Sequence, residues 1–549
     1  MDSPAARFQE LVRRVSELRR SGQLKEALEL FEEVLRTEPQ SFEALYRAGV
    51  VAAQLGIPHV ALGLLDRSIG IDPENAAAHC NRGVVLQSLE RLAAALASFD
   101  TAVAIKADYA LAHKNRGNVL DAVGRWEAAL ESYDTAIEID SDFAEAHCGR
   151  GNVLQKLGRS DAALASYDRA IRIDPYLVEA HSNRGVALTA VSRLSDALAS
   201  FDRAIVIRPD YAEAHVGRGN AFKELNRLDD ALVDYNRAIT LRADYAEAHF
   251  SRAITLLLRG DLEQGWLDYE WRPRKRDLSQ PPWLGAEPIA AKSLLVHSEK
   301  GLGDTLQFCR YVKLLSERGA RVILQVQAPL RDVLATLEGA SCVVAEGDSL
   351  PDVDYQCPLL SLPLAFKTTL QTIPLSRKYL RADAHKAAAW RARLGQPKKP
   401  RIGLVWRGDP NNRDDRNRSI PLSEVLKHLP VRFDYFALQK QLTESESMMQ
   451  AFPRRSASID ELDFPQTAAL IECLDLLISV DTSVAHLGAA LGQKTWILLP
   501  FSPDCRWLLN RCDSPWYPTV KLYRQHTLGE WAGVLARVAA DLDQEFSDS

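Results

Sequence analysis

The sequence predicts two structural classes in one chain: an all-helical repeat array over residues 1–272, and an α/β region with two parallel sheets. Three observations lead to this prediction. Several residue types recur every 34 positions in the first half. The recurrence is lost near Pro281 and Pro282, and from Ser293 onward short apolar runs alternate with helical stretches. At least two domains of different architecture therefore follow each other along the chain.

The composition excludes several functional classes. Of the 549 residues, 46% are hydrophobic and 26% are charged, as in ordinary soluble globular proteins. The formal net charge of −6 does not fit the basic footprint of a nucleic-acid-binding protein. No run of about 18 apolar residues is present, so no membrane-spanning helix is predicted. The first residues are charged and lack the pattern of a secretory signal, and we expect a cytoplasmic location.

The cysteines are scattered rather than paired. None belongs to a C-x-x-C motif, which argues against a zinc ribbon or a disulfide framework. We expect buried free thiols in a reducing compartment. The eight cysteines are Cys80, Cys148, Cys309, Cys342, Cys357, Cys473, Cys505 and Cys512.

Each 34-residue unit predicts a pair of amphipathic helices. The first helix carries A-x-H-x-N-R-G-x-x-L and the second D-A-L-x-S-Y-D-x-A-I, with small residues where helices touch and large ones between them. A helix pair of this length and pattern resembles the tetratricopeptide repeat (TPR). The resemblance covers about residues 8–272, as seven full units and a degraded eighth. It implies a superhelical array that binds other proteins and does not catalyse.

Histidine and arginine recur in register with the repeat. The histidines, from His79 to His249, stand one turn before a repeated glycine, and their spacing holds them too far apart to share a metal ion. We therefore favour a packing role for them. The arginines are expected to form an internal row of ion pairs with aspartates of the second helices. These aspartates are Asp100, Asp134, Asp168 and Asp202.

Two sets of asparagines share repeat positions. In TPR proteins these first-helix positions tend to face the concave groove, where an asparagine can bond the backbone of an extended peptide. Peptide contact and simple solvation are both consistent with the sequence. The sets are Asn81, Asn115 and Asn183, and, three residues further on in the unit, Asn118, Asn152 and Asn220.

The second half predicts two Rossmann-like lobes separated by a cleft. After a linker at 273–292, the first lobe covers 293–385, a Lys/Pro-containing linker covers 386–400, and the second lobe covers 401–549. Strand–helix alternation favours parallel sheets covered on both faces, with ligands at the carboxyl ends of strands. The expected strands are 293–299, 322–327, 342–346, 402–406, 433–439, 476–480 and 495–500, and the expected helices are 305–318, 330–338, 421–429, 464–474 and 484–491.

Two strand ends in these lobes carry candidate anion-binding loops. In SEKGLGDTLQF (298–308), glycines including Gly303 precede Asp304, which is either a helix cap or a catalytic base. In VWRGDPNNRDDRNRSIPL (405–422), arginine forks suit diphosphate oxygens, but Arg and Asp side chains that neutralise each other in a solvated loop are the alternative. The arginines are Arg407, Arg413, Arg416 and Arg418.

Two further strand ends complete the candidate site. Gln439, in FALQKQ, stands at a strand end suited to a base or ribose edge. The segment ISVDTSVAHLGAALG (478–492) delivers Asp481 and Thr482, then begins a helix at Ser483 with His486 on its first turn. Main-chain amides at this helix start predict a phosphate seat.

These motifs carry a second resemblance. S-V-D-T-S-V-A-H-L-G-A-A-L-G resembles the donor-site motif of the heptosyltransferase-like (family 9) glycosyltransferases, and GLGDTLQF resembles their N-terminal G-D-x-L element. The resemblance covers about residues 293–535 and implies a GT-B fold, with an acceptor-side lobe at 293–385 and a nucleotide-sugar lobe at 401–549. Repeats joined to such a module also resemble the protein O-GlcNAc transferases and the bacterial flagellin glycosyltransferases.

The resemblance implies roles for single residues. Asp304 matches the general base that takes a proton from the acceptor hydroxyl. Thr482, Ser483 and His486 match positions that hold the nucleotide diphosphate, and Asp481 orders that loop. Arg418, with Arg416 as its competitor, falls where the family often has a lysine near the phosphates. Gly303, Arg407 and Gln439 complete the predicted nucleotide-sugar site.

We expect a glycosyltransferase that moves a sugar from a nucleotide-diphosphate sugar to a hydroxyl of a protein held by the repeats, with a flagellin-like protein as one candidate acceptor. The nucleotide sugar is a co-substrate, and no other cofactor is expected. No D-x-D pair stands at a strand end, since D-L-D (541–543) lies in the tail, and we expect transfer without a metal. The alternative is a non-catalytic scaffold with a vestigial nucleotide-sugar domain.

Overall fold

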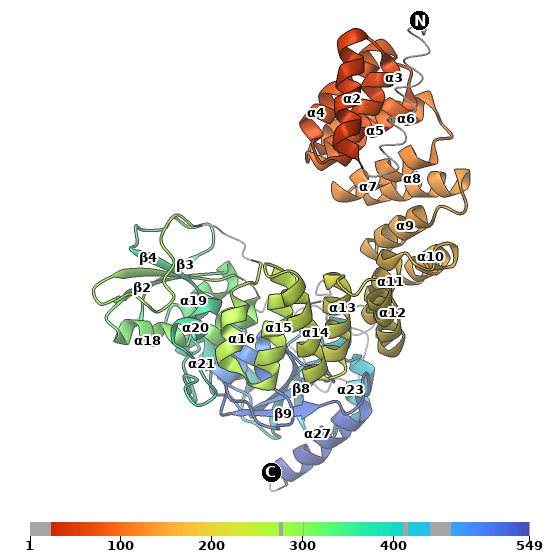
Figure 1. The fold of residues 1–549 in the computed structure, drawn as a ribbon. Helices are drawn as coiled ribbons and strands as arrows, with labels where there is room; N and C mark the ends of the chain where they lie inside the picture. Colours follow the sequence, from red (N-terminus) through yellow and green to blue (C-terminus); the bar gives the residue numbers. More distant parts are fainter. Residues whose placement is uncertain (1–22, 274–277, 300, 410–414, 440–462, 548–549) are drawn as a thin grey trace, which may run out of the picture. The chain divides into compact units, whose positions relative to one another are not determined.

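The computed structural model describes residues 23–273, 278–299, 301–409, 415–439 and 463–547 (Figure 1). The chain forms two compact units, residues 1–218 and residues 219–549. The described residues of the first unit form only repeat helices, and the second unit contains the last repeat helices together with two parallel sheets. The division therefore falls inside the predicted array 1–272, because its last helices pack with the sheets.

The first unit is a row of helices of 13 or 14 residues joined by short turns. The expected two-helix repeat is confirmed in every described unit of this region. The helices are α2 (Leu24–Thr37), α3 (Phe42–Gln54), α4 (Pro58–Ile71), α5 (Ala76–Ser88), α6 (Leu92–Ile105), α7 (Ala110–Ala122), α8 (Trp126–Ile139), α9 (Ala144–Lys156), α10 (Ser160–Ile173), α11 (Val178–Ala190) and α12 (Leu194–Ile207).

The repeated glycine lets the two helices of a unit approach each other. A Cβ atom at Gly151 on α9 would lie 2.5 Å from the ring of Tyr167 on α10, and one at Gly83 on α5 would lie 2.7 Å from the ring of Phe99 on α6. Both rings are fully buried. The 34-residue period thus records a small residue on one helix matched to an aromatic residue on the next.

The arginine row connects neighbouring units, as predicted. Arg116 on α7 donates Nε to Asp100 on the preceding helix (2.6 Å) and NH1 to Ser132 on the following one (2.7 Å). Arg82, Arg150 and Arg184 repeat both contacts, while Arg218 repeats the one to its aspartate, Asp202. The histidines have the expected structural role, because each places Nε2 within 2.9–3.1 Å of a carbonyl oxygen in the preceding turn.

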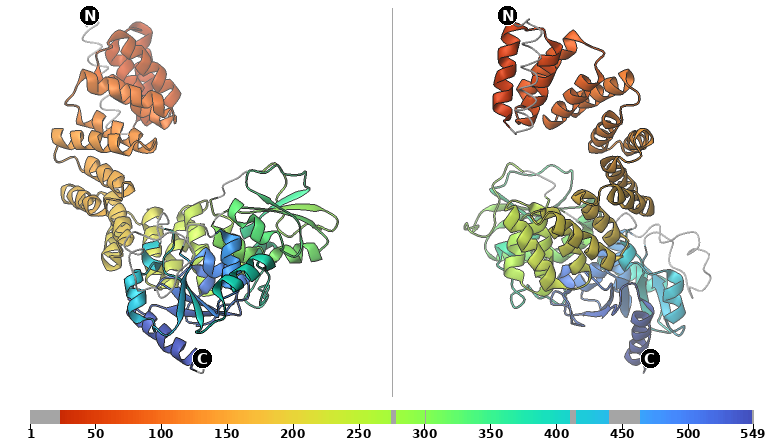
Figure 2. Two further views of the ribbon diagram at one scale, coloured as in Figure 1. Left: turned by 180° about the vertical axis from the view of Figure 1, so that it is seen from behind. Right: turned by 45° about the vertical axis from the view of Figure 1, so that its right-hand side comes forward.

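The second unit begins with the last repeat helices, which pack on the sheet-containing region (Figures 1 and 2). Asn226 donates Nδ2 to the carbonyl of Phe501 (2.7 Å). Arg272, whose side chain is fully buried, donates to Glu299 (2.7 Å) and Ser361 (2.7 Å) of the first lobe. The helices are α13 (Ala212–Glu224), which crosses the unit boundary, α14 (Leu228–Leu241), α15 (Ala246–Arg259) and α16 (Leu262–Tyr269).

The first sheet has four parallel strands in the order β3-β2-β1-β4. The order reverses between β1 and β4, so their carboxyl ends form a switch point. Helix α17 follows β1 and carries Asp304. The strands are β1 (Ser293–His297), β2 (Arg321–Val326), β3 (Ala340–Ala345) and β4 (Tyr355–Pro358), and the α-helices are α17 (Leu302–Phe308), α18 (Tyr311–Glu317), α19 (Arg331–Leu334) and α20 (Leu362–Ala365).

The second sheet has five parallel strands in the order β6-β5-β7-β8-β9. Its order reverses between β5 and β7, which places residues 406–408 and 481–482 at a second switch point. Apolar clusters cover both faces, as predicted. The strands are β5 (Arg401–Val405), β6 (Asp434–Ala437), β7 (Leu476–Val480), β8 (Thr495–Leu499) and β9 (Val520–Arg524), and the helices are α21 (Ala384–Leu394), α22 (Asp415–Arg418), α23 (Leu422–His428), α25 (Phe464–Ile471), α26 (Ser483–Ala490) and α27 (Ala532–Glu545).

The structure differs from the sequence prediction in five segments of this unit. Strands β4 and β9 were not expected, and the helix predicted at 305–318 is split into α17 and α18. The split lets the buried Arg310 donate to the carbonyls of Gln307 and Trp516. The predicted linker 386–400 contains most of α21. The predicted linker 273–292 is packed from Trp283 onward, because the Trp283 amide donates to the Gln356 carbonyl in β4.

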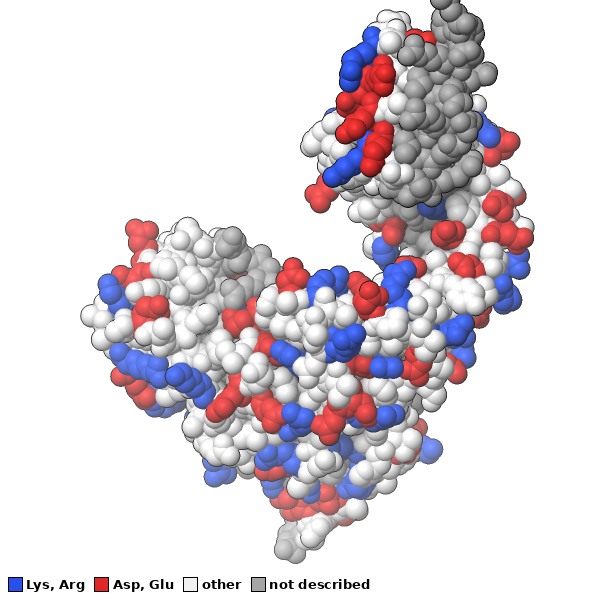
Figure 3. All heavy atoms as spheres, in the orientation of Figure 1, with Lys and Arg blue, Asp and Glu red and all other residues white. Residues whose placement is uncertain are grey.

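The cysteines follow the sequence prediction only in part. All eight cysteines are free, but Cys342 and Cys512 are exposed, so the expectation of buried thiols is wrong for these two. None of the described helices combines the length and the apolar character needed to cross a bilayer. On the face shown in Figure 3, basic and acidic side chains are intermixed over the sheet-containing unit.

The glycine–aromatic contact predicts a stability difference between two alanine variants. Gly151→Ala should lower the free energy of unfolding by about 1–3 kcal/mol, because the methyl group would overlap the Tyr167 ring. Gly63→Ala on α4 is the matched control, because nothing lies within 4 Å of its added Cβ, and it should be neutral or stabilising by up to about 1 kcal/mol. Denaturant unfolding followed by circular dichroism measures both, and equal effects would contradict the packing explanation.

Candidate functional site

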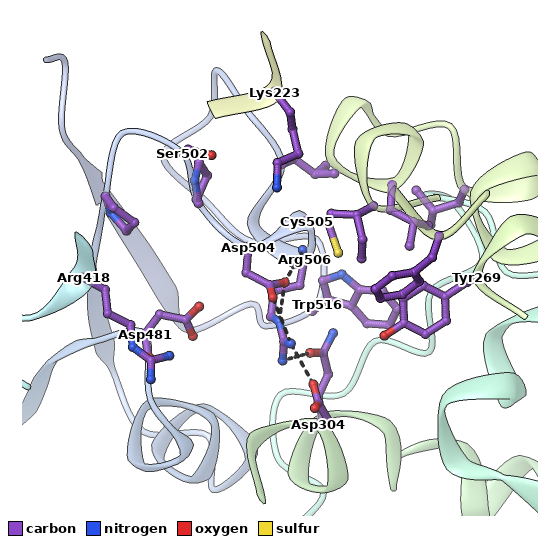
Figure 4. Close-up of a pocket in the computed structure, with 18 of the residues that line it drawn as sticks. Lys223, Tyr269, Asp304, Arg418, Asp481, Ser502, Asp504, Cys505, Arg506 and Trp516 are labelled. Atoms are coloured by element: carbon purple, nitrogen blue, oxygen red, sulfur yellow. Dashed lines mark hydrogen bonds and ion pairs between the residues drawn. The ribbon is translucent and has the colours of Figure 1, made fainter. Parts of the chain in front are cut away.

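A cavity of about 410 Å³ opens at the carboxyl ends of the strands in the second unit (Figure 4). Asp304 and Gln307 of α17 line it from the first lobe. Asp481, directly after β7, lines it from the second lobe together with Arg418 of α22 and the segment 500–508 after β8. Helices α15 and α16 of the repeats form a further wall. Both sheets and the repeat array therefore contribute side chains to one site.

Asp304 is a helix cap and also lines the cavity, and its role as a catalytic base stays a prediction. Its Oδ2 accepts from the Gly301 amide (3.2 Å) at the start of α17. Its Oδ1 faces the cavity and accepts from NH2 of Arg506 (2.7 Å). One oxygen caps the helix, and the other is available to the chemistry of the site.

Arg506 occupies the centre of the cavity and was missed by the sequence analysis (Figure 4). It contacts Asp304 and Gln307 of the first lobe and Asp504 and His486 of the second. Burial lowers the pKa of Arg506, but the charges of Asp504, Asp304 and Asp481 outweigh it and raise that pKa well above its usual value. Its position after strand β8, a strand end that the sequence analysis did not consider, is the signal that could have found it.

His486 is buried and does not line the cavity. Its Nε2 lies 3.2 Å from NH1 of Arg506 and 3.6 Å from Asp481, and its Nδ1 lies 2.8 Å from the Tyr517 hydroxyl. Because a guanidinium can only donate, Nε2 accepts and Nδ1 carries the proton. Burial lowers the pKa of His486, and the charge of Arg506 lowers it further. The neutral imidazole thus accepts a hydrogen bond from Arg506 and orients its guanidinium without lining the cavity itself.

Asp481 and Arg418 form the opposite end of the cavity from the repeat wall (Figure 4). Arg418 donates NH1 to the Asp481 carbonyl (3.1 Å) and Nε to Asp415 (3.1 Å). Burial raises the pKa of Asp481, but His486 and Arg506 outweigh it and hold that pKa below its usual value. This end offers one arginine with further donors beside a carboxylate that stays ionised.

The other predicted residues of the second lobe hold the backbone rather than line the cavity. Gln439 accepts from the Arg407 amide (3.1 Å), which joins the ends of β6 and β5. The Thr482 hydroxyl caps α26 by accepting from the Ala485 amide (3.5 Å). Ser483 is the first residue of that helix and lies outside the cavity lining.

Three predicted residues remain to be placed. A Cβ atom at Gly303 would lie 2.8 Å from the His486 ring, so this glycine lets α17 and α26 approach each other. The Arg416 side chain and residue 413 lie outside the described parts of the chain. Among the described residues, no group of His, Cys, Asp or Glu side chains is arranged to hold a metal ion.

The asparagines predicted to face the groove form hydrogen bonds with other residues of the array. Asn81 donates to Tyr46 (2.8 Å), and Asn183 donates to Asn152 (2.9 Å). Asn118, Asn152 and Asn220 accept from the buried tyrosines Tyr133, Tyr167 and Tyr235 at 2.6–2.8 Å. Asn115 is buried, with Nδ2 3.9 Å from the Cys80 sulfur. These amides orient neighbouring helices, and peptide contact stays a prediction.

Comparison with known proteins identifies the repeats. Models described as "Tetratricopeptide repeat" match residues 12–76, 58–110 and 144–177, and a model described as "TPR repeat" matches residues 122–158 and 219–260. The N-terminal region is built from tetratricopeptide repeats. A TPR protein named YrrB, whose structure is described as having an unusual peptide-binding site, is 25% identical over 34% of this chain and 95% of its own, with a TM-score of 0.28.

Two further proteins are similar to this chain. A tetratricopeptide repeat protein from Parabacteroides merdae is 17% identical over 45% of this chain and 98% of its own, with a TM-score of 0.39. Protein FlbA of Caulobacter vibrioides is 25% identical over 326 residues, which are 53% of this chain and 54% of FlbA. The chain therefore spans about half the length of this curated relative.

The buried His486 predicts a pH-dependent stability. Its folded pKa lies below the unfolded value of about 6.5, so the unfolded chain binds the proton first, and stability is fully present above that pH and declines as pH falls towards the folded pKa. His486→Asn should therefore flatten the loss of Tm between pH 8 and pH 5. His59→Asn, at an exposed position of α4, is the control and should follow the wild type. A wild-type pH profile in His486→Asn would contradict this assignment.

Proposed function

We propose that this protein is a glycosyltransferase that moves a sugar from a nucleotide-diphosphate sugar to a hydroxyl of a protein held by the repeats. The observation that carries the proposal is the meeting of Asp304 and Asp481, from the carboxyl ends of two parallel sheets, in one cavity. Each comes from a motif that resembles the family 9 glycosyltransferases. The cavity is polar at this end and is closed on one side by TPR helices.

Arg506 and Arg418 supply the positive charge that the donor phosphates need. The leaving nucleotide gains negative charge as the sugar–phosphate bond breaks, and arginine forks stabilise phosphate oxygens without a metal. Both arginines line the cavity. Arg418 donates to the Asp481 carbonyl, and the charge of the Asp481 carboxylate helps to raise the pKa of Arg506, so Asp481 interacts with both. His486 contributes indirectly, because its neutral Nε2 orients Arg506.

Asp304 is the proposed general base. Its Oδ1 accepts the proton of the acceptor hydroxyl while the hydroxyl oxygen bonds the anomeric carbon, and the nucleotide leaves with the electron pair of the broken bond. Arg506 holds Oδ1 of Asp304 in an ion pair at 2.7 Å. Donor phosphate oxygens compete for the same guanidinium, so donor binding releases Asp304 for the reaction.

The same ion pair favours the alternative function. In a non-catalytic scaffold, the ion pair of Arg506 and Asp304 has a purely structural role, because it joins the two lobes across the cavity. Nucleotide release separates the two functions. The chain is incubated with a panel of nucleoside diphosphate and monophosphate sugars, with flagellin as the first acceptor because of the resemblance to flagellin glycosyltransferases. Turnover with any donor supports the enzyme, and the absence of turnover with every donor supports the scaffold, whether or not nucleotide binds.

Asp304→Asn tests the base directly. The amide keeps one acceptor oxygen but cannot take a proton, so transfer should fall by at least about 100-fold while nucleotide binding, measured by calorimetry, persists. Asp332→Asn, at a surface position of α19 paired with Arg331, is the matched control and should keep full transfer. Retained turnover in Asp304→Asn, or loss of nucleotide binding with it, would deny Asp304 this role.

A further inference from the structure

The half of the cavity on the side of the repeats has an aromatic wall. Trp266 of α16 meets Phe308 of α17 and Trp516 edge-on, with ring centroids 6.0 and 6.5 Å apart. Figure 4 shows Trp516 and Tyr269 together on the side of the cavity away from Arg418 and Asp481. Three elements from distant parts of the chain thus fix one rigid apolar surface.

Two buried hydrogen-bond donors, one in this half and one next to Arg506 in the middle, have no partner among the described residues. They are the indole Nε1 of Trp266 and the side-chain Nε2 of Gln307. Trp266 is 6% exposed and Gln307 is fully buried, and both line the cavity. Arg506 donates to Oε1 of Gln307 (3.0 Å), which fixes the amide orientation and leaves Nε2 as the free donor. Buried donors without an acceptor are rare in folded proteins, and these two call for oxygen atoms from a ligand.

We propose that this half of the cavity binds a short extended segment of the protein acceptor, with backbone carbonyl oxygens on Trp266 and Gln307 and a Ser or Thr hydroxyl at Asp304. This proposal rests on the proposed function. The cavity is ordered along its length, with Arg418 and Asp481 at one end, Asp304 and Arg506 in the middle and the aromatic wall at the other (Figure 4). Donor and acceptor lie on opposite sides of the reacting carbon, so the end of the cavity away from Arg418 belongs to the acceptor.

The chemistry of the wall favours a peptide over other acceptors. Every peptide unit supplies a carbonyl oxygen that can accept from an unpaired donor. Ile254 and Leu257 of α15, together with the aromatic rings, can pack against apolar side chains of the peptide. The volume of about 410 Å³ encloses a short segment and not a folded surface. Helices α15 and α16 are the last helices of the TPR array, so the array itself lines this half of the cavity.

The test compares two tryptophan variants of the full-length chain. The probe is a mixture of capped pentapeptides with a central Ser or Thr, and binding is followed by saturation-transfer NMR without any nucleotide. Trp266→Phe keeps a ring but removes the unpaired donor, so peptide binding should weaken roughly three- to tenfold. Trp283→Phe loses the same volume and also a hydrogen bond to the Glu287 carbonyl (2.9 Å) outside the cavity. It should lower Tm more than Trp266→Phe does and leave binding unchanged.

A second variant keeps the test independent of that one side chain. Ile254→Trp should fill the cavity from α15 and abolish peptide binding while nucleotide binding persists. Peptides that bind Trp266→Phe and Ile254→Trp as well as the wild type overturn the proposal, and so does a wild type that binds no peptide. Because the probe binds without a donor, these results stand apart from the nucleotide-release assay. Peptide binding without nucleotide turnover therefore supports this site and contradicts only the proposed enzyme.

Discussion

The second unit depends on one half-buried arginine side chain that is surrounded by carboxylates. Arg506 is held by Asp304 of the first lobe and Asp504 of the second, and it also bonds Gln307 and His486. A guanidinium removed from water is tolerated only when its charge and its donors are met. Because its partners come from both sheets, this requirement fixes the two lobes relative to each other and determines which side chains face the cavity.

The last repeat helices form part of the cavity wall. Glycine–aromatic contacts and the arginine row make each TPR unit pack in the same way on the next. The last units do not end in solvent, since Arg272 is buried against Glu299 and Trp266 packs on Phe308 and Trp516. The last repeat helices and the cavity thus share one continuous core.

Polar residues at strand ends serve two purposes that the sequence does not separate. Asp304, Asp481 and Arg418 line the cavity, whereas Gln439 and Thr482 accept from the backbone amides of Arg407 and Ala485 beside it. A strand end leaves amides and carbonyls unpaired, so nearby polar side chains are needed to bond them. Which residue caps and which faces a ligand depends on the neighbouring strand, and the neighbour is set by sheet order. His486 illustrates this, because a residue expected at the ligand is buried behind Arg506.

The sequence by itself determined the repeats, all described strands except β4 and β9, and three residues of the cavity, because periodicity and buried apolar runs are local properties of the chain. It could not determine strands β4 and β9, the role of Arg506 or the contribution of α15 and α16 to the cavity. Residue 506 lies 202 positions from Asp304 and meets it only when the two lobes pack. Tertiary structure decided these features, since a long-range ion pair or a shared wall leaves no periodic trace in the sequence.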